Sequence, residues 1–393
     1  MTEPLIIVGA GLAGWTTARE FRKLDPNSPV LLITSDGGDF YAKPSLSNAY
    51  VQQRSPAQLV STPAARMAET LKVELRAHTR VTGIDVAQQR LHTDQGDFAW
   101  RALVLATGAQ AIRLPLRGDA ADGVLSINHL DDFTAFHARL EAVRRARPET
   151  PPRVLIMGAG LIGCEFANDL AATGHAVTLV DPAPLPMATL LPAPASEALQ
   201  AALGSLGVQW HLGSTVTSIH RAAASSTSTE HGELVVELAD GHQVRADLVL
   251  SAIGLRSDTA LAQAAGLACE RGILVDAALQ TSAPNVYALG DNSQYASGRT
   301  LPYVMPIMNA ARALANTLNG QRTEVVFPLM PVGIKTPALP VVVAPPPPGT
   351  AGAWQAIEPG VWQFHGDDAQ VRGFVLTGAQ TSRRLEQSKL VAL

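Results

Sequence analysis

Short runs of apolar residues recur along the chain, and polar residues seldom interrupt them. Runs of four to six residues with little polar alternation are typical of strands that are buried on both faces of a parallel sheet. Helices are predicted after two of the runs, at Ala13–Arg22 and Ile162–Thr173. This alternation predicts an α/β fold with helices on both faces of parallel sheets. The predicted strands are Leu5–Val8, Val30–Thr34, Ala102–Ala106, Arg153–Met157, Ala176–Val180, Asp247–Ala252 and Asn285–Ala288.

The pattern repeats once. VGAGLAG at Val8–Gly14 is matched by MGAGLIG at Met157–Gly163, with an offset of 149 between their first glycines (158 − 9). VLATG ends at Gly108 and VLSAIG ends at Gly254, an offset of 146 (254 − 108). Two landmarks at nearly one spacing indicate two copies of a βαβ nucleotide-binding unit. The fold class is therefore expected to be α/β with two Rossmann-like dinucleotide-binding domains.

The first glycine loop follows a predicted strand and opens a predicted helix. In such a loop the first glycine permits the tight turn, the second lets a pyrophosphate approach the backbone, and the third lets helix and strand pack closely. An acid that binds the ribose is expected at the end of the next strand. Here Asp36 is one candidate, and the hydroxyls of Thr34 and Ser35 are the alternative. The loop residues expected to bind the first nucleotide are Gly9, Ala10, Gly11, Leu12, Ala13 and Gly14.

The second loop contains Gly158, Gly160 and Gly163. Asp181 lies 18 residues beyond Gly163, at the end of the next predicted strand. A carboxylate in this place accepts hydrogen bonds from the adenosine ribose and repels a 2′-phosphate. Because residues 182–200 contain no Arg or Lys, the second site is expected to prefer NADH to NADPH.

Composition narrows the function. Hydrophobic residues make up 47% of the 393 residues and the formal net charge is −4, so a nucleic-acid partner is not expected. No apolar run reaches 18 residues, so no membrane span is expected. The two cysteines form no C-x-x-C, and residues 1–4 carry no Lys or Arg, so a reduced, cytoplasmic location is predicted. A linker is expected at Arg147–Pro152 and a hairpin loop at Ala222–Gly232.

Further motifs carry a family resemblance. TSDGGDFYAKPSLS, LATGA, GCEFA and YALGD resemble the pyridine-nucleotide–disulfide oxidoreductase superfamily in its ferredoxin-reductase-like branch. LPYVMPIMNAARALANTL and VGIKTPALPVVVAPPP are similar to the rubredoxin reductases within that branch. The resemblance covers essentially the whole chain. It implies an FAD domain at residues 1–114 and 247–320, an NAD domain at residues 115–246, and a small α+β C-terminal domain at residues 321–393.

The resemblance also assigns individual residues. Lys43 is similar to the lysine near the isoalloxazine ring, where a cation favours reduced flavin, and Glu165 is similar to the acid that pairs with it. Asp291 is similar to the Asp at the ribityl–pyrophosphate part of FAD. The other implied FAD contacts are Val81, Ala106, Thr107, Gly108, Val304 and Lys335.

The cysteines exclude one route for electrons. Disulfide reductases of the superfamily use a cysteine pair, whereas YAKPSLSNAY contains none, so electrons are expected to leave directly from the flavin. No H-E-x-x-H or C-x-x-C occurs, so no metal is expected. The implied activity is NADH oxidation through FAD to a small iron–sulfur carrier, first of all rubredoxin, in electron supply to a hydroxylase such as an alkane hydroxylase. A ferredoxin reductase of a multicomponent oxygenase, a membrane-surface quinone reductase and an FAD/NADH sensor remain alternatives.

Overall fold

Two compact units alternate along the chain in the computed structural model, which describes residues 3–222 and 232–392. Unit 1 comprises Met1–Ala42, Gln58–Gln110 and Leu255–Met330. Unit 2 comprises Lys43–Ala57, Ala111–Gly254 and Pro331–Leu393. The expected α/β class is confirmed. Residues 223–231 of the loop expected at Ala222–Gly232 lie outside the described residues.

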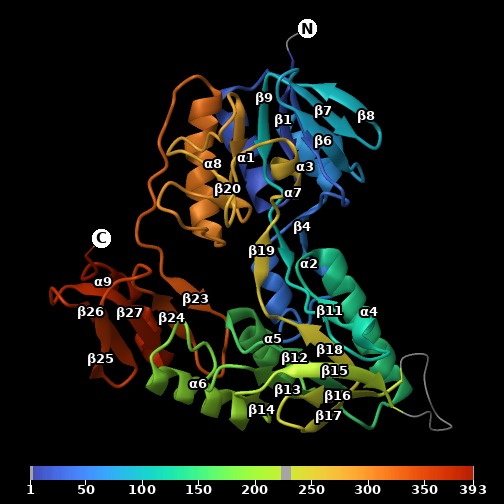
Figure 1. The fold of residues 1–393 in the computed structure, drawn as a ribbon, viewed down its shortest axis with the longest axis vertical. Coiled ribbons are helices and arrows are strands. Elements are labelled where there is room, and N and C mark those ends of the chain that lie inside the picture. The colour runs from blue at the N-terminus through green and yellow to red at the C-terminus, as the bar shows by residue number, and fades with distance from the viewer. Residues whose placement is uncertain (1–2, 223–231, 393) are drawn as a thin grey trace. The chain divides into compact units, whose positions relative to one another are not determined.

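Unit 1 is built on a five-stranded parallel sheet in the order β21–β9–β1–β2–β5. Every residue of β1, β2, β9 and β21 is buried, as their apolar sequences predict. Helices α1 and α8 pack side by side on this sheet (Figure 1). The elements are β1 Leu5–Val8, α1 Leu12–Leu24, β2 Val30–Ile33, β3 Phe40–Tyr41, β4 Val60–Thr62, α3 Ala64–Leu71, β5 Glu74–Arg76, β6 Val81–Asp85, β7 Arg90–Thr93, β8 Gly96–Ala99, β9 Ala102–Leu105, β19 Leu255–Ser257, α7 Ala260–Ala264, β20 Ile273–Leu274, β21 Val286–Ala288, β22 Ser293–Gln294 and α8 Val304–Leu318.

Unit 2 contains a second five-stranded parallel sheet, in the order β11–β18–β12–β13–β14. The linker at Arg147–Pro152 is confirmed, since α4 ends at Ala146 and β12 begins at Arg153. The elements are the 3-10 turn η1 Lys43–Asn48, η2 Ala121–Gly123, β11 Leu125–Ser126, α4 Leu130–Ala146, β12 Arg153–Met157, α5 Leu161–Ala172, β13 Ala176–Asp181, α6 Ala193–Ser205, β14 Gln209–Leu212, β15 Val216–Arg221, β16 Leu234–Leu238, β17 Gln243–Ala246 and β18 Leu248–Ser251. Two further short elements, α2 Pro56–Leu59 and β10 Ala109–Ala111, lie where the chain passes between the units.

The two sheets share one plan, which confirms the predicted repeat. In each sheet the strand before the glycine loop (β1 or β12) lies between the strand after the first helix (β2 or β13) and a later strand (β9 or β18). Each unit also carries a three-stranded antiparallel sheet, β6–β7–β8 in unit 1 and β15–β16–β17 in unit 2. The repeats differ in the edge strand beside β9 or β18. In unit 1 this strand is β21, which follows the other four strands of its sheet in sequence, whereas in unit 2 it is β11, which precedes the other four.

The C-terminal part of unit 2 is a five-stranded antiparallel sheet in the order β23–β24–β27–β26–β25. Its core strands bury apolar side chains such as Val361, Phe374 and Leu376. The last helix, α9, is short and follows the 3-10 turn η3. The elements are β23 Val332–Ile334, β24 Val341–Ala344, β25 Gly352–Glu358, β26 Val361–Gly366, β27 Val371–Thr377, η3 Gly378–Arg383 and α9 Arg384–Ser388.

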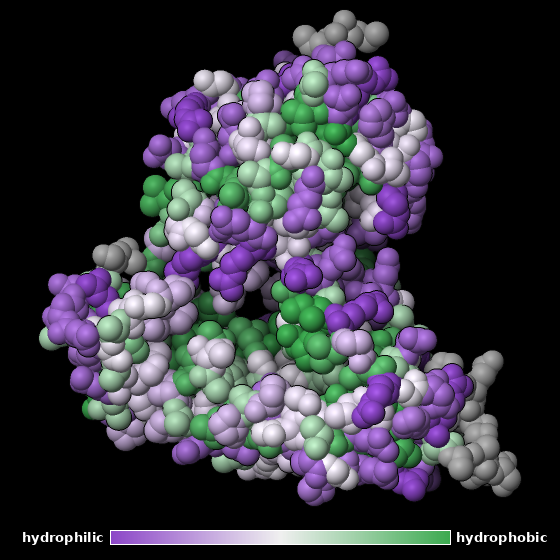
Figure 2. All heavy atoms as spheres, in the orientation of Figure 1, coloured by the Kyte–Doolittle hydropathy of each residue, from purple (hydrophilic) through white to green (hydrophobic). Residues whose placement is uncertain are grey.

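None of the helices in the described part of the chain has the length and apolar character needed to cross a bilayer. On the face shown in Figure 2, hydrophilic side chains gather over the β6–β7–β8 sheet of unit 1. Exposed charged residues of that sheet include Arg90 and Asp97. This small sheet therefore has one face toward solvent, as antiparallel sheets commonly do.

Candidate dinucleotide-binding sites

The first glycine loop is shaped by the close approach of two backbone segments. Gly9 has a φ of +106°, and a β-carbon there would lie 2.3 Å from the carbonyl oxygen of Ala106. A β-carbon on Gly14 would lie 1.9 Å from the oxygen of Gly9. Gly11, by contrast, has no atom within 4 Å of that position. The chain itself therefore requires glycine at the first and third positions, while the second leaves open space where a pyrophosphate fits.

Helix α1 begins directly after this loop with a positive end. Its N-cap, Gly11, makes no side-chain cap, and its first turn contains no acid. The first backbone N–H groups of a helix have no intrahelical partner and carry the positive end of the helix dipole. The loop thus fits the anionic centre of a dinucleotide.

The residues after β2 form a hydrogen-bonded turn. The hydroxyl of Thr34 donates to Asp36 Oδ1 over 2.7 Å, and the backbone N–H of Gly38 donates to the same oxygen over 3.0 Å. Ser35 is exposed and makes no such bond within the described residues. Thr34 and Asp36 therefore belong to one hydrogen-bonded turn. Binding of a ribose by either residue remains a prediction.

Asp291 lies beside the first glycine loop. A β-carbon on its neighbour Gly290, whose φ is +94°, would lie 3.1 Å from the β-carbon of Ala13. The hydroxyl of Ser257 donates to the backbone oxygen of Asp291 over 2.7 Å and fixes this turn. The position fits the expected contact of Asp291 with the ribityl–pyrophosphate part of FAD.

Sequence reasoning missed Asn292, the residue that ties this region together. Asn292 is fully buried, and its Nδ2 donates to the backbone oxygen of Leu105 over 3.0 Å and to Thr107 Oγ1 over 3.1 Å. The Thr107 hydroxyl donates in turn to the oxygen of Asp258 over 3.2 Å. Gly108 beside it has a φ of +73°. Asn292 directly follows the YALGD motif, so its place in the sequence is the signal that could have identified it.

Two further predicted FAD contacts lie in unit 1. Val81 is the first residue of β6, and its half-buried side chain packs against the hydrophobic core of unit 1. Val304 begins α8, and 39% of it is exposed. Their contacts with a flavin remain predictions.

The second glycine loop repeats the geometry of the first. Gly158 has a φ of +100°, and a β-carbon there would lie 2.7 Å from the oxygen of Ala252. A β-carbon on Gly163 would lie 1.9 Å from the oxygen of Gly158, while Gly160 has open space. Helix α5 begins after Gly160 with no side-chain cap and no acid in its first turn.

Asp181, at the end of β13, contacts this second loop. Its Oδ2 accepts a hydrogen bond from the backbone N–H of Ala159 over 2.7 Å, and its Oδ1 accepts one from Ala183 over 2.8 Å. The carboxylate therefore lies at the glycine loop, where a ribose hydroxyl of a bound dinucleotide can reach it. This placement supports the predicted nucleotide contact of Asp181.

The expected pairing of Lys43 with Glu165 is wrong. Lys43 Nζ donates to Asn128 Oδ1 over 2.6 Å. Glu165, which is 1% exposed, instead forms an ion pair with Lys335 Nζ. The Ser47 hydroxyl donates to Glu165 Oε2 over 2.6 Å, and the backbone N–H of Lys335 donates to Oε1 over 2.9 Å. The resemblance could not show this exchange, because the two lysines lie far apart in sequence and only packing decides which one meets the acid.

One turn further along α5, Asp169 has a related role. Its two oxygens accept hydrogen bonds from the backbone N–H groups of Tyr50 and Val51, over 3.0 and 2.8 Å. Burial raises the pKa of Asp169 above its usual value, against the opposing effect of these hydrogen bonds. Glu165 and Asp169 thus hold η1 and the residues after it on α5, which is why residues 43–57 belong to unit 2.

The cysteines are unpaired, and Cys164 is buried. The Cys164 thiol donates to the oxygen of Ala159 over 3.3 Å, and burial raises its pKa far above the ordinary value. Burial also raises the pKa of Cys269. Neither thiol has the low pKa that a redox-active cysteine needs at neutral pH.

Two family models match the chain. The pyridine nucleotide-disulphide oxidoreductase model matches residues 3–314, and the rubredoxin binding C-terminal domain model matches residues 324–391. These matches confirm the resemblance seen in the sequence.

Relatives align over nearly the whole chain. The rubredoxin-NAD(+) reductase of Alcanivorax borkumensis is 43% identical over 98% of both proteins. The nitric oxide reductase FlRd-NAD(+) reductase of Aeromonas salmonicida is 40% identical over 97% of this chain and 95% of its own length. Among solved structures, putidaredoxin reductase in a covalent complex with putidaredoxin has a TM-score of 0.86 at 22% identity, covering 99% of this chain and 93% of that one. At this identity the structural similarity shows that the two proteins share a fold.

Proposed function

Because the chain belongs to the pyridine nucleotide-disulphide oxidoreductase family, we propose that it oxidises NADH with bound FAD and passes the electrons to rubredoxin. The observation that carries the proposal is the match of residues 324–391 to a rubredoxin binding domain, following two complete glycine loops. The first loop binds the pyrophosphate of FAD and the second that of NADH. When bound, FAD would supply the two-electron acceptor for the hydride and the one-electron donor for the carrier.

The chain's own residues bind and orient the two nucleotides. Gly11 and Gly160 leave space for the pyrophosphates, and Asp181 selects the ribose of NADH. Stacking the two reactive rings in one geometry is the main contribution that a protein makes to hydride transfer. The buried, high-pKa thiol of Cys164 keeps that residue out of an electron relay.

The C-terminal sheet presents a surface suited to a small acidic carrier. Leu385 and Ile357 are 71% and 48% exposed there. Arg383 bridges Glu358 and Glu386, which places α9 against the end of β25. Exposed apolar side chains next to cations are a common feature of interfaces with acidic partners.

The basic residues available for docking agree only in part with those that the sequence indicates. The sequence offers Lys43, Arg299, Lys335 and the Arg383–Arg384 pair as candidates. Arg383 and Lys335 already form ion pairs with carboxylates of the same chain. Arg384 and Lys389 are exposed and have no carboxylate within ion-pair distance among the described residues. We propose that these two cations steer rubredoxin to the C-terminal sheet.

The test is steady-state reduction of purified rubredoxin by NADH, beside ferredoxin, a quinone and an FlRd-type carrier. Rubredoxin is expected to have the highest kcat/KM, and that value is expected to fall as salt rises, because steering acts mainly on the association rate. Arg384→Glu is expected to lower kcat/KM for rubredoxin several-fold. Arg66→Glu, an equal charge change on an exposed residue of α3 in unit 1, is the matched control.

Each outcome has a defined meaning. Equal effects of the two charge reversals, or a rate that does not vary with salt, would remove the docking surface. Faster reduction of ferredoxin or of the FlRd-type carrier would show that this carrier, and not rubredoxin, is the electron acceptor. The FlRd-type carrier is the main rival because of the relative from Aeromonas salmonicida. Slow turnover with every carrier would favour a sensor.

The unpaired cysteines support our further proposal of a cytoplasmic location.

A further inference from the structure

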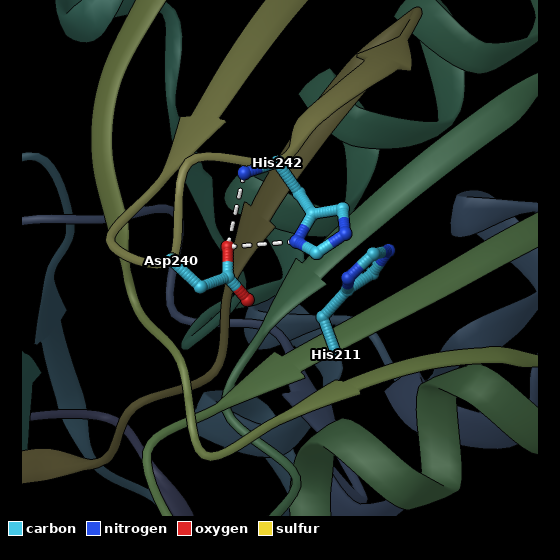
Figure 3. A group of neighbouring side chains, drawn as sticks. All are labelled: His211, Asp240 and His242. Atoms are coloured by element: carbon cyan, nitrogen blue, oxygen red, sulfur yellow. Dashed lines mark hydrogen bonds and ion pairs between the residues drawn. The ribbon is translucent and has the colours of Figure 1, made fainter.

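Unit 2 brings together three side chains that the sequence gives no reason to connect. His211 lies on β14, and Asp240 and His242 lie in the turn between β16 and β17 (Figure 3). One ligand atom from each residue lies within 4.8 Å of the other two. Among the described residues this is the only group of three or more His, Cys, Asp or Glu side chains so arranged. Spacing rules could not find it, because the residues come from two separate layers.

The turn holds Asp240 in place before any ligand binds. The backbone N–H of His242 donates to Asp240 Oδ1 over 3.1 Å, and His242 Nδ1 lies 3.2 Å from the same oxygen. Figure 3 shows both imidazole rings on one side of this carboxylate. The ring centres of His211 and His242 are 5.7 Å apart.

The surroundings leave room for an ion and its water. His211 also lines a cavity of about 310 Å³, together with residues of β12, β13 and β17 such as Gln243. His242 has 68% of its side chain exposed, so solvent reaches the group. The polar residues lining the cavity include Arg153 and Arg245, and both are paired with Glu233. Arg153 is also paired with Asp247, so the positive charge beside the cavity is partly neutralised and opposes a cation less than two free guanidinium groups would.

We propose that His211, Asp240 and His242 form a site for a divalent transition-metal ion such as Zn²⁺. Two imidazole nitrogens and one carboxylate oxygen are a donor set that such ions bind, with water in the remaining position. Metal–ligand bonds are about 2.0–2.2 Å long, so the ligand atoms close in by a small rotation of the exposed His242 ring. The ion fastens the β16–β17 turn to β14, the edge strand of the parallel sheet.

This site is independent of the proposed electron transfer, since none of its three residues belongs to a glycine loop or contacts Glu165. The experiment uses the FAD-loaded protein, stripped of metal with a chelator and titrated with ZnCl₂ by calorimetry. Each chain is expected to bind one Zn²⁺, and the temperature of unfolding is expected to rise with Zn²⁺ concentration. His211→Ala and His242→Ala are each expected to weaken binding by about tenfold or more, by analogy with the cost of disturbing a metal's supporting residues.

His92→Ala is the matched control. His92 Nδ1 lies 2.9 Å from Asp97 Oδ1, which gives an exposed His–Asp pair without a third ligand. It is expected to leave Zn²⁺ affinity unchanged. In a parallel experiment, the electron paramagnetic resonance spectrum of bound Cu²⁺ is expected to show two coupled imidazole nitrogens in the wild type and one in His242→Ala. No binding by the wild type, equal affinity in the three variants, or an unchanged Cu²⁺ spectrum would each overturn the proposal.

Discussion

A pair of glycine substitutions in the second loop separates folding from NADH binding. At Gly163 an added β-carbon would lie 1.9 Å from the oxygen of Gly158 and 3.0 Å from its carbon. A comfortable carbon–oxygen contact is about 3.3 Å or longer, so the overlap is about 1.4 Å. Because both atoms are backbone, no side chain can relieve the overlap by changing rotamer. Helix α5 must move off β12 instead, and overpacking of this kind costs about 1–3 kcal/mol.

Gly160 behaves in the opposite way. Its φ and ψ are −75° and −170°, an extended conformation that alanine adopts, and no atom lies within 4 Å of an added β-carbon. Gly160→Ala is therefore expected to leave stability unchanged or raise it by about 0.4–1 kcal/mol through the unfolded chain. The new methyl group occupies the space where the pyrophosphate approaches, so NADH affinity is expected to fall by about tenfold or more, equivalent to about 1.4 kcal/mol.

Two measurements distinguish these effects. Denaturant unfolding gives the stability, and anaerobic stopped-flow reduction of the flavin across a range of NADH concentrations gives the affinity. Gly11→Ala is the matched control, because it makes the same change in the first loop and is expected to lower FAD content without altering the NADH loop. Unchanged NADH affinity in Gly160→Ala would show that the open space is not the pyrophosphate site. Wild-type stability in Gly163→Ala would refute the steric argument.

Three further predictions concern charged residues. Asp181→Ala is expected to reduce the preference for NADH over NADPH, mainly through KM, and equal use of both cofactors by the wild type would contradict the role of Asp181. Lys335→Met is expected to destabilise the protein by about 3–5 kcal/mol in denaturant unfolding, because it leaves buried Glu165 without its cation. Adding Glu165→Gln to this variant is expected to recover most of the lost stability. Equal stabilities of the wild type and Lys335→Met would show that the ion pair contributes little. Although burial alone would raise the pKa of Asp247, hydrogen bonds from Arg153 and its neighbours lower it, so the stability that Asp247 contributes is present above about pH 4 and is lost as pH falls through the lower folded pKa. Acid titration of unfolding is expected to show a smaller pH dependence in Asp247→Asn than in the wild type.

The sequence predicts the buried parallel strands well, because their apolar runs have no competing interpretation. Leu5–Val8 and Arg153–Met157 agree with the structure at both ends. The strand expected at Asp247–Ala252 begins instead at Leu248, since Asp247 is drawn into ion pairs with Arg147 and Arg153. Such side-chain pairing depends on residues nearly a hundred positions away and leaves no local pattern.

The antiparallel strands were harder to predict. β25 is largely exposed along its length, and its pattern of burial does not alternate, so period-two alternation is absent. The same limit applies to the candidate sites. The glycine loops are local and the sequence predicts them, whereas the contact of Glu165 with Lys335 and the approach of His211 to Asp240 depend on tertiary packing.

The position of β21 at the edge of the unit 1 sheet has a consequence for synthesis on the ribosome. β9 is apolar throughout and hydrogen-bonds on one side to β1 and on the other to β21. The 180 residues between Leu105 and Val286 (286 − 105 − 1) must be translated before that second edge is covered. At about 5–20 residues per second, this takes roughly ten to forty seconds. During that time the nascent chain carries an unpaired apolar strand, the kind of edge that chaperones cover and that aggregates when they do not.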